Sequence, residues 1–259
     1  MTDSHDLEGG DVSLTSETAN ESTESFGLKE DWHSIEKTLE ELIPVYDKTN
    51  RYISLGSDLK LRRRGLESLR SFLDSDSFAT IDLGCGTGKM TQMLHSNFNG
   101  PAVLVDALLP MLRVAKERNG TAEGLVSVYE NLPFRRSTFD AAMAGFALRD
   151  ARDLSRALLE IQDMLKPGGF FLIVDLCKPN SHMKRGLIGM YWRIFAPLLA
   201  LFACGLRGLK FAALSTTYRR LPLNSEFSGL VERSGFEIKK VEYSMLEGAC
   251  IMLLKKSNT

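Results

Sequence analysis

The sequence predicts an α/β fold in which a seven-stranded, mostly parallel sheet carries helices on both faces. Short apolar runs alternate with helix-length segments, which is the pattern of strands joined by helical crossovers. The last two apolar runs are separated by only five residues, so they form a hairpin and one of them runs antiparallel. The predicted strands are 80–83, 102–105, 125–129, 139–145, 170–175, 237–243 and 249–255.

Helical spacing and end signals mark the segments between these strands. Pro110 begins a helix that Asn119 and Gly120 end. Residues 154–165 place their apolar side chains on one stripe, and the Lys-Pro-Gly-Gly run 166–169 stops that helix. Further helices are predicted after Gly88, within 225–234 and, amphipathic, over 32–43.

Charge is distributed unevenly along the 259 residues. Residues 1–31 contain nine acidic residues and one basic residue, a net charge of −8, so the remainder carries +7 of the total of −1. Small polar residues dominate this start and cannot bury enough surface to offset their ordering entropy, so we expect a disordered acidic tail. The basic remainder suits an anionic membrane surface or a nucleic acid.

Cysteine and histidine usage narrows the chemistry. The four cysteines are far apart and lack C-x-x-C spacing, which predicts reduced thiols in a cytoplasmic compartment. The four histidines show no paired spacing, so no metal site is expected. The acidic start lacks the apolar run of a secretory signal.

A glycine-rich turn between the first two strands predicts the ligand site. Gly84, Gly86 and Gly88 follow the strand 80–83, where the chain must turn sharply and leave bare backbone against a ligand. Lys89 stands where a dinucleotide fingerprint has its third glycine, and the pattern of a P-loop is also absent. Asp106 ends the second strand, where a carboxylate can take both hydroxyls of a ribose.

The Gly-x-Gly-x-Gly spacing with Asp82 ahead of it resembles motif I of the class I S-adenosylmethionine-dependent methyltransferases. Tyr46-Asp47-x-x-Asn50-x-x-x-Ser54-x-Gly56, Leu-Pro-Phe at 132–134 and Phe-x-x-Arg at 146–149 narrow the resemblance to the ubiquinone/menaquinone biosynthesis C-methyltransferases, the UbiE family. This implies S-adenosylmethionine as cofactor, a lipid-tailed quinol as substrate and transfer to a ring carbon. It also implies that 32–75 is a helical segment covering the cofactor site of a methyltransferase domain at 76–259.

The resemblance assigns cofactor contacts residue by residue. Asp82 is expected at the methionine end and Asp106 at the ribose. Relatives usually place Asp or Asn where Val128 stands, so the adenine is left to backbone amides, apolar walls or Glu130. The expected cofactor-binding set is Tyr46, Asp82, Gly84, Gly86, Thr87, Gly88, Asp106, Val128, Tyr129, Glu130 and Gly145.

Carbon methylation requires that a neighbouring hydroxyl lose its proton, with a base to take it or a cation to stabilise the oxyanion. Arg149 is expected to be that cation. Asp150 replaces the family's Asn and, with Asp47, is a candidate base. Tyr218 and His182 are the other candidates, and the sequence does not choose among the four.

The insertion at about 178–222 contains an apolar stretch of 18 residues, 187–204, with one charge, Arg193. Basic residues flank both sides, so no membrane orientation is favoured, and a span would separate the last two strands from their sheet. We therefore expect a helical cap that lines an apolar pocket and lies at the inner face of an anionic membrane. The protein would be cytoplasmic and peripherally membrane-associated, with a homodimer left open.

Three other functions remain open at this stage. A phospholipid N-methyltransferase would share motif I and the membrane setting. A cofactor-binding partner without catalysis is compatible with the departures at Val128 and Asp150. RNA methylation would suit the basic charge, but no basic stripe interleaved with aromatic residues accompanies it, so no nucleic acid is expected.

Overall fold

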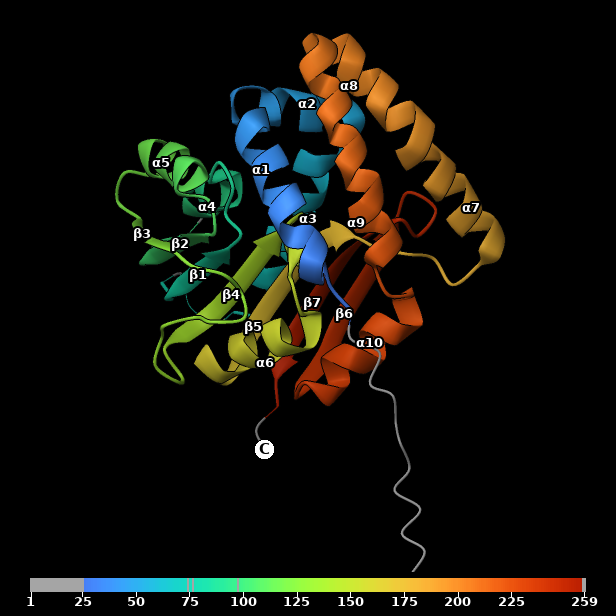
Figure 1. Cartoon of the computed structure of the whole chain (residues 1–259). Helices are drawn as coiled ribbons and strands as arrows, with labels where there is room; N and C mark the ends of the chain where they lie inside the picture. The colour runs from blue at the N-terminus through green and yellow to red at the C-terminus, as the bar shows by residue number, and fades with distance from the viewer. Residues whose placement is uncertain (1–25, 74, 76, 97, 258–259) are drawn as a thin grey trace, which may run out of the picture.

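The computed structural model describes residues 26–257, apart from 74, 76 and 97. Seven strands form one sheet in the order β3-β2-β1-β4-β5-β7-β6 (Figure 1). Each pairing from β3 to β5 is parallel, whereas β7 is antiparallel to both of its neighbours. The strands are β1 (Thr80–Leu83), β2 (Ala102–Asp106), β3 (Glu123–Val126), β4 (Phe139–Gly145), β5 (Leu165–Leu176), β6 (Phe236–Ser244) and β7 (Ala249–Lys256).

The predicted sheet is confirmed, with two changes of boundary. β3 lies at Glu123–Val126, so Tyr129 belongs to the loop after it rather than to the strand. The extended backbone of β5 begins at Leu165, directly where the preceding helix ends. The first change matters for the site, because a loop residue can turn its side chain toward the neighbouring strand ends.

Ten α-helices and five other helical segments accompany the strands in the described part of the chain. The α-helices are α1 (Trp32–Leu42), α2 (Tyr46–Ile53), α3 (Ser57–Arg70), α4 (Lys89–His95), α5 (Leu109–Arg118), α6 (Leu154–Met164), α7 (His182–Met190), α8 (Ala196–Cys204), α9 (Leu214–Arg220) and α10 (Asn224–Arg233). The other helical segments are Lys29–Asp31, Ile43–Val45, Leu148–Asp150, Tyr191–Phe195 and Gly205–Ala213.

Two apolar cores lie on opposite faces of the sheet. On one face α6 and α10 bury Leu158, Ile161 and Val231 against Phe171 and its neighbours. On the other, α3 and α4 pack on the alternate residues of β4, β5 and β7. Alternation along each strand sends successive side chains to opposite faces, so every central strand is buried on both sides. This layered core fixes where the strands end, and hence where the loops after them meet.

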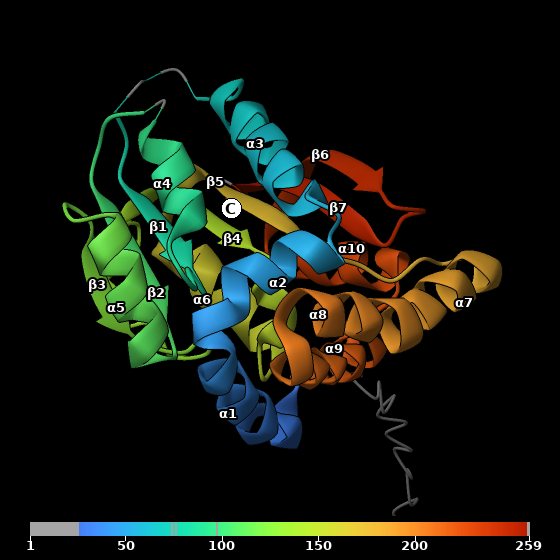
Figure 2. The same ribbon diagram turned by 90° about the horizontal axis from the view of Figure 1, so that it is seen from above.

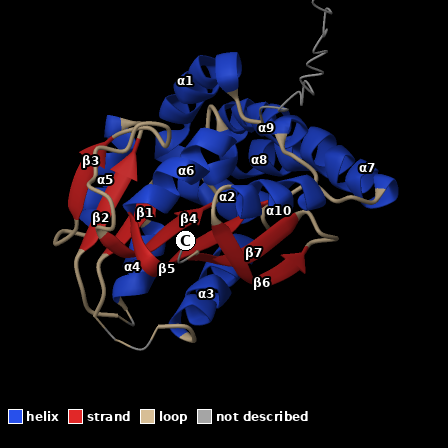
Figure 3. Ribbon diagram, turned by 90° about the horizontal axis from the view of Figure 1, so that it is seen from below, coloured by secondary structure: helices blue, strands red, loops and turns tan. Residues whose placement is uncertain are grey.

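Helices from the N-terminal segment and from the insertion lie over the carboxyl edge of the sheet. Figures 1 and 2 show α1 and α2 above the ends of β1 and β4, with α8 and α9 beside them. The view from below shows α3 and α4 on one face of the sheet and α6 on the other (Figure 3). Helices from the N-terminal segment and from the insertion therefore cover the edge that carries the glycine turn.

The first described residues pack beside these covering helices. Leu28 is buried, and its amide donates to the carbonyl of Ala151 at 2.8 Å. The Arg152 guanidinium lies 5.1 Å from the centre of the Trp32 ring. Of the predicted acidic tail, residues 1–25 lie outside the described residues, whereas 26–31 pack against the segment after β4.

The apolar insertion forms a helical hairpin. One helix, His182–Phe211, is long and apolar enough to cross a membrane by length and composition, although only 28% of its most apolar window is buried. It turns back at Gly205, and a side chain at Gly208 would lie 2.0 Å from the Ala200 carbonyl oxygen. Small residues therefore allow the two arms of the hairpin to touch.

Candidate active site

The glycine turn after β1 adopts the left-handed backbone that its sequence predicts. Gly84, Gly86 and Gly88 have φ values of 60°, 54° and 74°. A Cβ on Gly84 would lie 2.1 Å from the Tyr129 hydroxyl and 2.6 Å from the Cβ of Ala147. Only glycine fits there, because conformation and space both exclude a side chain.

Two adjoining pockets open on this turn. They offer about 660 and 760 Å³ of space, part of it open to solvent, which suits small-molecule sites. Tyr46, Gly84, Gly86 and Phe146 line both. The α1-side pocket is also lined by Trp32, Leu39, Asp106, Leu108, Met111, Ser127, Val128, Tyr129, Glu130, Asp150 and Arg152. The α3-side pocket is also lined by Asp47, Asn50, Asp58, Leu61, Arg62, Thr87, Lys89, Gly145, Arg149, Leu176 and Trp192.

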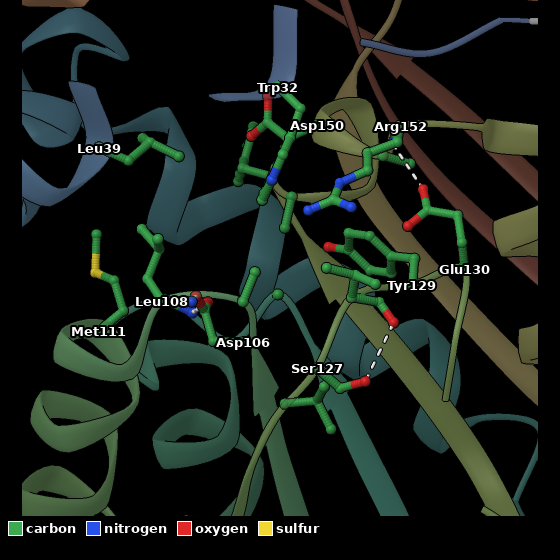
Figure 4. A pocket seen from close by; sticks show the side chains of 18 of the residues that line it. Trp32, Leu39, Asp106, Leu108, Met111, Ser127, Tyr129, Glu130, Asp150 and Arg152 are labelled. Atoms are coloured by element: carbon green, nitrogen blue, oxygen red, sulfur yellow. Dashed lines mark hydrogen bonds between the residues drawn. The ribbon is translucent and has the colours of Figure 1, made fainter. Parts of the chain in front are cut away.

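Asp106 lies at the floor of the α1-side pocket (Figure 4). Its Oδ2 accepts a hydrogen bond from the Gly86 amide at 2.8 Å and its Oδ1 from the Leu108 amide at 2.9 Å. Burial raises the pKa of this carboxyl, and the two amide hydrogen bonds oppose that rise. The carboxylate thus holds the glycine turn to the end of β2, and each of its oxygens keeps a lone pair for a ligand hydroxyl.

Glu130 forms one wall of the same pocket. Its Oε1 accepts from the amides of Arg152 at 2.7 Å and Asp153 at 3.0 Å. Its Oε2 is buried and has no hydrogen-bond partner among the described residues. An acceptor without a partner is costly, so this oxygen is suited to a donor that a ligand brings. Val128 and Tyr129 lie on the same wall, and the Tyr129 hydroxyl donates to the Leu83 carbonyl at 3.3 Å.

Asp47 fastens α2 to the glycine turn. Its Oδ1 accepts from the Thr87 hydroxyl at 2.8 Å, and its Oδ2 pairs with Arg118 at 2.8 Å. Lys89 approaches Oδ1 at 3.4 Å. Burial favours the protonated form, but the Thr87 and Arg118 hydrogen bonds and the Lys89 charge outweigh it and lower the pKa of Asp47. A carboxylate held in this way is a weak base.

Arg149 lies between two carboxylates under the α3-side pocket. Its Nη1 donates to Asp175 Oδ1 at 2.9 Å, and its backbone amide donates to Asp175 Oδ2 at 3.1 Å. Asp150 Oδ1 lies 3.9 Å from Nε, which has no hydrogen-bond partner among the described residues. Burial favours loss of the proton, but the charges of Asp150 and Asp175 outweigh it and raise the pKa of Arg149.

Asp150 itself is buried. Burial raises its pKa to about 6 against the opposing charge of Arg149, and Asp175 adds to the rise. Its Oδ1 accepts from the Thr217 hydroxyl on α9 at 3.3 Å. The site therefore holds one carboxyl that changes protonation near pH 6, beside one that stays charged and coordinated, Asp47.

Four predicted residues lie away from the pocket walls. Asp82 is buried below the glycine turn, where its Oδ2 accepts from the Thr91 hydroxyl at 2.7 Å, and burial raises its pKa to about 6. Gly88 begins α4 against Ala115. Tyr218 donates to the Arg185 carbonyl, and His182 is exposed beside Arg185, so neither lines either pocket. The roles of Tyr218 and His182 as bases stay predictions.

The structure adds residues that sequence reasoning missed. Asp175 is the last residue but one of β5, at the same edge where Asp106 ends β2, so the rule that found Asp106 could have found it. Trp32 and Trp192 come from helices whose orientation the sequence does not give. Arg62 stands in a run of three arginines, of which only the first faces the pocket.

This sheet order, with a glycine turn after the first strand and an acidic residue ending the second, defines an S-adenosylmethionine-dependent methyltransferase of class I. The chain belongs to the ubiE/COQ5 methyltransferase family, which matches residues 26–255.

Two relatives illustrate the sequence similarity. The ubiquinone/menaquinone biosynthesis C-methyltransferase UbiE of Syntrophotalea carbinolica is 30% identical over 82% of this chain and 89% of its own length. The demethylmenaquinone methyltransferase of Thermus thermophilus is 30% identical over 77% of this chain and 91% of its own.

Solved structures share the fold. A methyltransferase of Thermotoga maritima superposes with a TM-score of 0.57 and 18% identity, over 88% of this chain and 99% of its own. The [4+2]-cyclase SpnF also reaches 0.57, at 16% identity over 76% of this chain and 81% of its own. A protein named for a different reaction thus has the same fold, so the likeness in structure establishes the fold alone.

The pockets fit S-adenosylmethionine on their chemistry. The α1-side pocket offers the Asp106 carboxylate for hydroxyls and the unpartnered Glu130 Oε2 for an amino group. The α3-side pocket offers cationic side chains beside bare glycine backbone. These are the group types of the nucleoside and amino-acid halves of this cofactor.

Proposed function

We propose that this methyltransferase methylates a ring carbon of a lipid-tailed quinol in menaquinone or ubiquinone biosynthesis. The observation that carries the proposal is the α3-side pocket, where the buried Arg149–Asp150–Asp175 cluster adjoins an apolar wall of Leu176 and Trp192. Such a pocket suits a hydroxylated ring with an apolar tail. The relatives named for ubiquinone and menaquinone biosynthesis support the same acceptor.

Bound S-adenosylmethionine supplies an electrophilic methyl group. The reaction forms a carbon–carbon bond at the ring and breaks the carbon–sulfur bond, whose electron pair stays on sulfur. A phenolic hydroxyl of the acceptor must first lose its proton, and the ring then releases the hydrogen that the methyl replaces. The protein therefore has to orient the acceptor, stabilise an oxyanion and accept a proton.

Arg149 is the proposed stabiliser of the oxyanion, since its Nε is buried without a hydrogen-bond partner among the described residues. Asp150 is the proposed base, because a carboxyl with a pKa near 6 is ionised at neutral pH and is a better base than an exposed one. Asp47 has a lowered pKa and three partners, so we assign it to positioning. Asp150 lines the α1-side pocket, whereas the acceptor would lie in the α3-side pocket. A water molecule would therefore relay the proton from the acceptor hydroxyl to Asp150.

The cofactor contacts follow from the same geometry. We infer that Asp106 binds the ribose hydroxyls and that Glu130 accepts from the adenine amino group. Tyr46, Gly84 and Gly86 line both pockets, so they would lie along the middle of the cofactor. Thr87, Gly145, Val128 and Tyr129 complete the walls. Asp82 and Gly88 would act indirectly, by shaping the glycine turn.

The outer face of the helical arm formed by α7 and α8 supports contact with an anionic membrane. Met183, Leu187, Met190, Ile194, Leu198 and Phe202 recur every three or four residues and are exposed, up to 85% for Phe202. The inner face of the same helix buries Ile188, Trp192, Ala196 and Ala200. Residues 182–213 contain five basic residues and no acidic residue, which suits an in-plane helix on anionic lipid.

This arrangement links the membrane to the acceptor pocket. Trp192 lines the α3-side pocket from the inner face, two residues from Ile194 on the outer face. A lipid tail would therefore reach the pocket from the surface on which the helix rests. We propose a cytoplasmic protein bound peripherally to the inner face of the membrane, and a homodimer stays a prediction.

A methyl-transfer assay tests the acceptor. The protein is incubated with methyl-labelled S-adenosylmethionine and vesicles that contain reduced demethylmenaquinone, with phosphatidylethanolamine vesicles in parallel. The proposal expects label in the quinone fraction. Label only in phospholipid would replace the quinol with a phospholipid acceptor, and tight cofactor binding without transfer would favour a non-catalytic partner.

A further inference from the structure

Arg62 of α3 reaches across to the end of β4. Its Nη2 donates to the Gly145 carbonyl at 3.0 Å, and its Nη1 approaches the Met90 sulfur at 3.8 Å. The guanidinium carbon lies 5.1 Å from the centre of the Phe146 ring. Phe146 has a left-handed backbone, with φ of 55°, and this conformation turns the chain at the end of the strand. The guanidinium is therefore held in place on the pocket wall.

The positive charge of Arg62 has no paired anion. Its Nε is buried without a hydrogen-bond partner, and no carboxylate lies within 4.0 Å of it among the described residues. The nearby acids are engaged elsewhere: Asp82 accepts from Thr91, and Asp58 accepts from Ser54 at 3.0 Å. The charges of Asp82 and Asp58 lie further off and do not outweigh the burial of Arg62, so an anion in contact with its guanidinium would be stabilised.

The other cations of this pocket are already paired. Arg149 binds Asp175 at 2.9 Å. Lys89 lies 3.4 Å from Asp47, which also binds Arg118. Within the described part of the chain, Arg62 is thus the guanidinium of this pocket that has no carboxylate in salt-bridge contact.

We propose that Arg62 binds the carboxylate of the methionine half of S-adenosylmethionine. Gly84 and Gly145 line the pocket beside it and provide the bare backbone along which an amino-acid chain can lie. A guanidinium matches a carboxylate with two parallel hydrogen bonds. The inference rests on the cofactor and not on the identity of the acceptor.

The test compares two ligands that differ only in this carboxylate. Calorimetry gives the affinities of S-adenosylmethionine and decarboxylated S-adenosylmethionine for the wild type and for Arg62→Met. The carboxylate should add about 10- to 100-fold to wild-type affinity, the worth of hydrogen bonds between charged groups. In Arg62→Met that advantage should vanish, and in Arg62→Lys part of it should return.

Arg64→Met is the matched control, because Arg64 lies two residues further on α3, is exposed and pairs with Glu242. It should bind both ligands like the wild type. An unchanged preference for the carboxylate in Arg62→Met would overturn the inference. Equal loss of both ligands would also overturn it, since Arg62 would then serve the shape of the pocket.

Failure of the proposed acceptor is distinguishable from failure of this inference. If the wild type binds S-adenosylmethionine but does not methylate quinol, the acceptor is wrong while the ligand comparison still decides the role of Arg62. If Arg62→Met binds both ligands normally and loses only turnover, the guanidinium acts on the acceptor, and the carboxylate assignment is wrong.

Discussion

The Asp47 carboxylate accepts a hydrogen bond from the Thr87 hydroxyl at 2.8 Å, joining α2 to a glycine turn that lies 40 residues further along the chain. The Tyr-Asp signature of the N-terminal segment is thereby fixed to the turn that it covers. Tyr46, the neighbour of Asp47, lines both pockets as a result. Asp47, a candidate base in the sequence, therefore joins α2 to the glycine turn.

A positioning role and a role as general base predict opposite effects of Asp47→Asn. If Asp47 has a positioning role, the variant loses the attraction to Arg118 and Lys89. Cofactor affinity should then fall roughly 5- to 20-fold with little change in kcat. Calorimetry with S-adenosylhomocysteine and saturating kinetics measure the two quantities. Intact affinity with kcat reduced a hundredfold would instead make Asp47 the base.

Asp106→Asn tests the ribose site. The amide keeps one acceptor but loses the charge that can take two hydroxyls, so the affinity for S-adenosylhomocysteine should fall more than about tenfold. Asp140→Asn is the control, because Asp140 begins β4 at the opposite edge of the sheet and pairs with Lys166. Unchanged affinity in Asp106→Asn would remove Asp106 from the cofactor site.

Arg149→Lys should lower turnover about a hundredfold while cofactor affinity stays within a factor of a few. Lysine keeps the charge between Asp150 and Asp175 but cannot present the same planar donors. Thermal unfolding checks that the buried cluster survives. A wild-type kcat in a stable Arg149→Lys variant would exclude the guanidinium from the mechanism.

The pKa of Asp150, about 6, sets a pH dependence. Below this pH the carboxyl is protonated and cannot accept a proton, so kcat should rise with pH through about 6 and then level off. Asp150→Asn should lose this rise and most of the activity. If the rise persists in Asp150→Asn, another group is the base.

The same shift affects stability with a defined sign. The folded state holds the Asp150 proton to a higher pH than the unfolded chain, whose Asp titrates near 3.8. Stability from this source is complete below pH 3.8 and is lost as pH rises through about 6. Asp82 adds to this loss, since its pKa is also raised to about 6. Denaturant unfolding of Asp150→Asn should therefore show a smaller fall across that window.

The outer face of α7–α8 is tested by flotation with anionic vesicles. Replacing Ile194, Leu198 and Phe202 with Ser should reduce vesicle binding more than about tenfold, since each removes exposed apolar area that lipid would bury. Methylation of a short-chain, water-soluble quinol should change little. Leu159→Ser on α6, which is 54% exposed, is the control. Unreduced vesicle binding in the triple variant would move the membrane contact elsewhere.

Sequence reasoning succeeded where local patterns fix local structure. The three glycines, the strand that Asp106 ends and the hairpin of the last two strands follow from spacing and conformational preference alone. It failed on Tyr129, predicted as strand, because the ring of that residue packs over Gly84, and this contact depends on the tertiary structure.

The remaining site residues could not be read from the sequence for a similar reason. Arg62, Arg63 and Arg64 are equivalent in the sequence, and only the rotation of α3 on the sheet turns Arg62 inward. Trp192 faces the pocket because the helix around it packs on α2, far away in the chain. Asp175 differs from these residues, because it lies near the carboxyl end of β5 and the strand-end rule applies to it as well.

The most direct test of the central claim is to locate the transferred methyl group. The protein is supplied with trideuteromethyl S-adenosylmethionine and reduced demethylmenaquinone in vesicles, and the product is examined by mass spectrometry and proton NMR. We expect a trideuteromethyl group on a ring carbon, with loss of the ring hydrogen at that carbon. A trideuteromethyl group on a quinol oxygen, with the ring hydrogen retained, would contradict it.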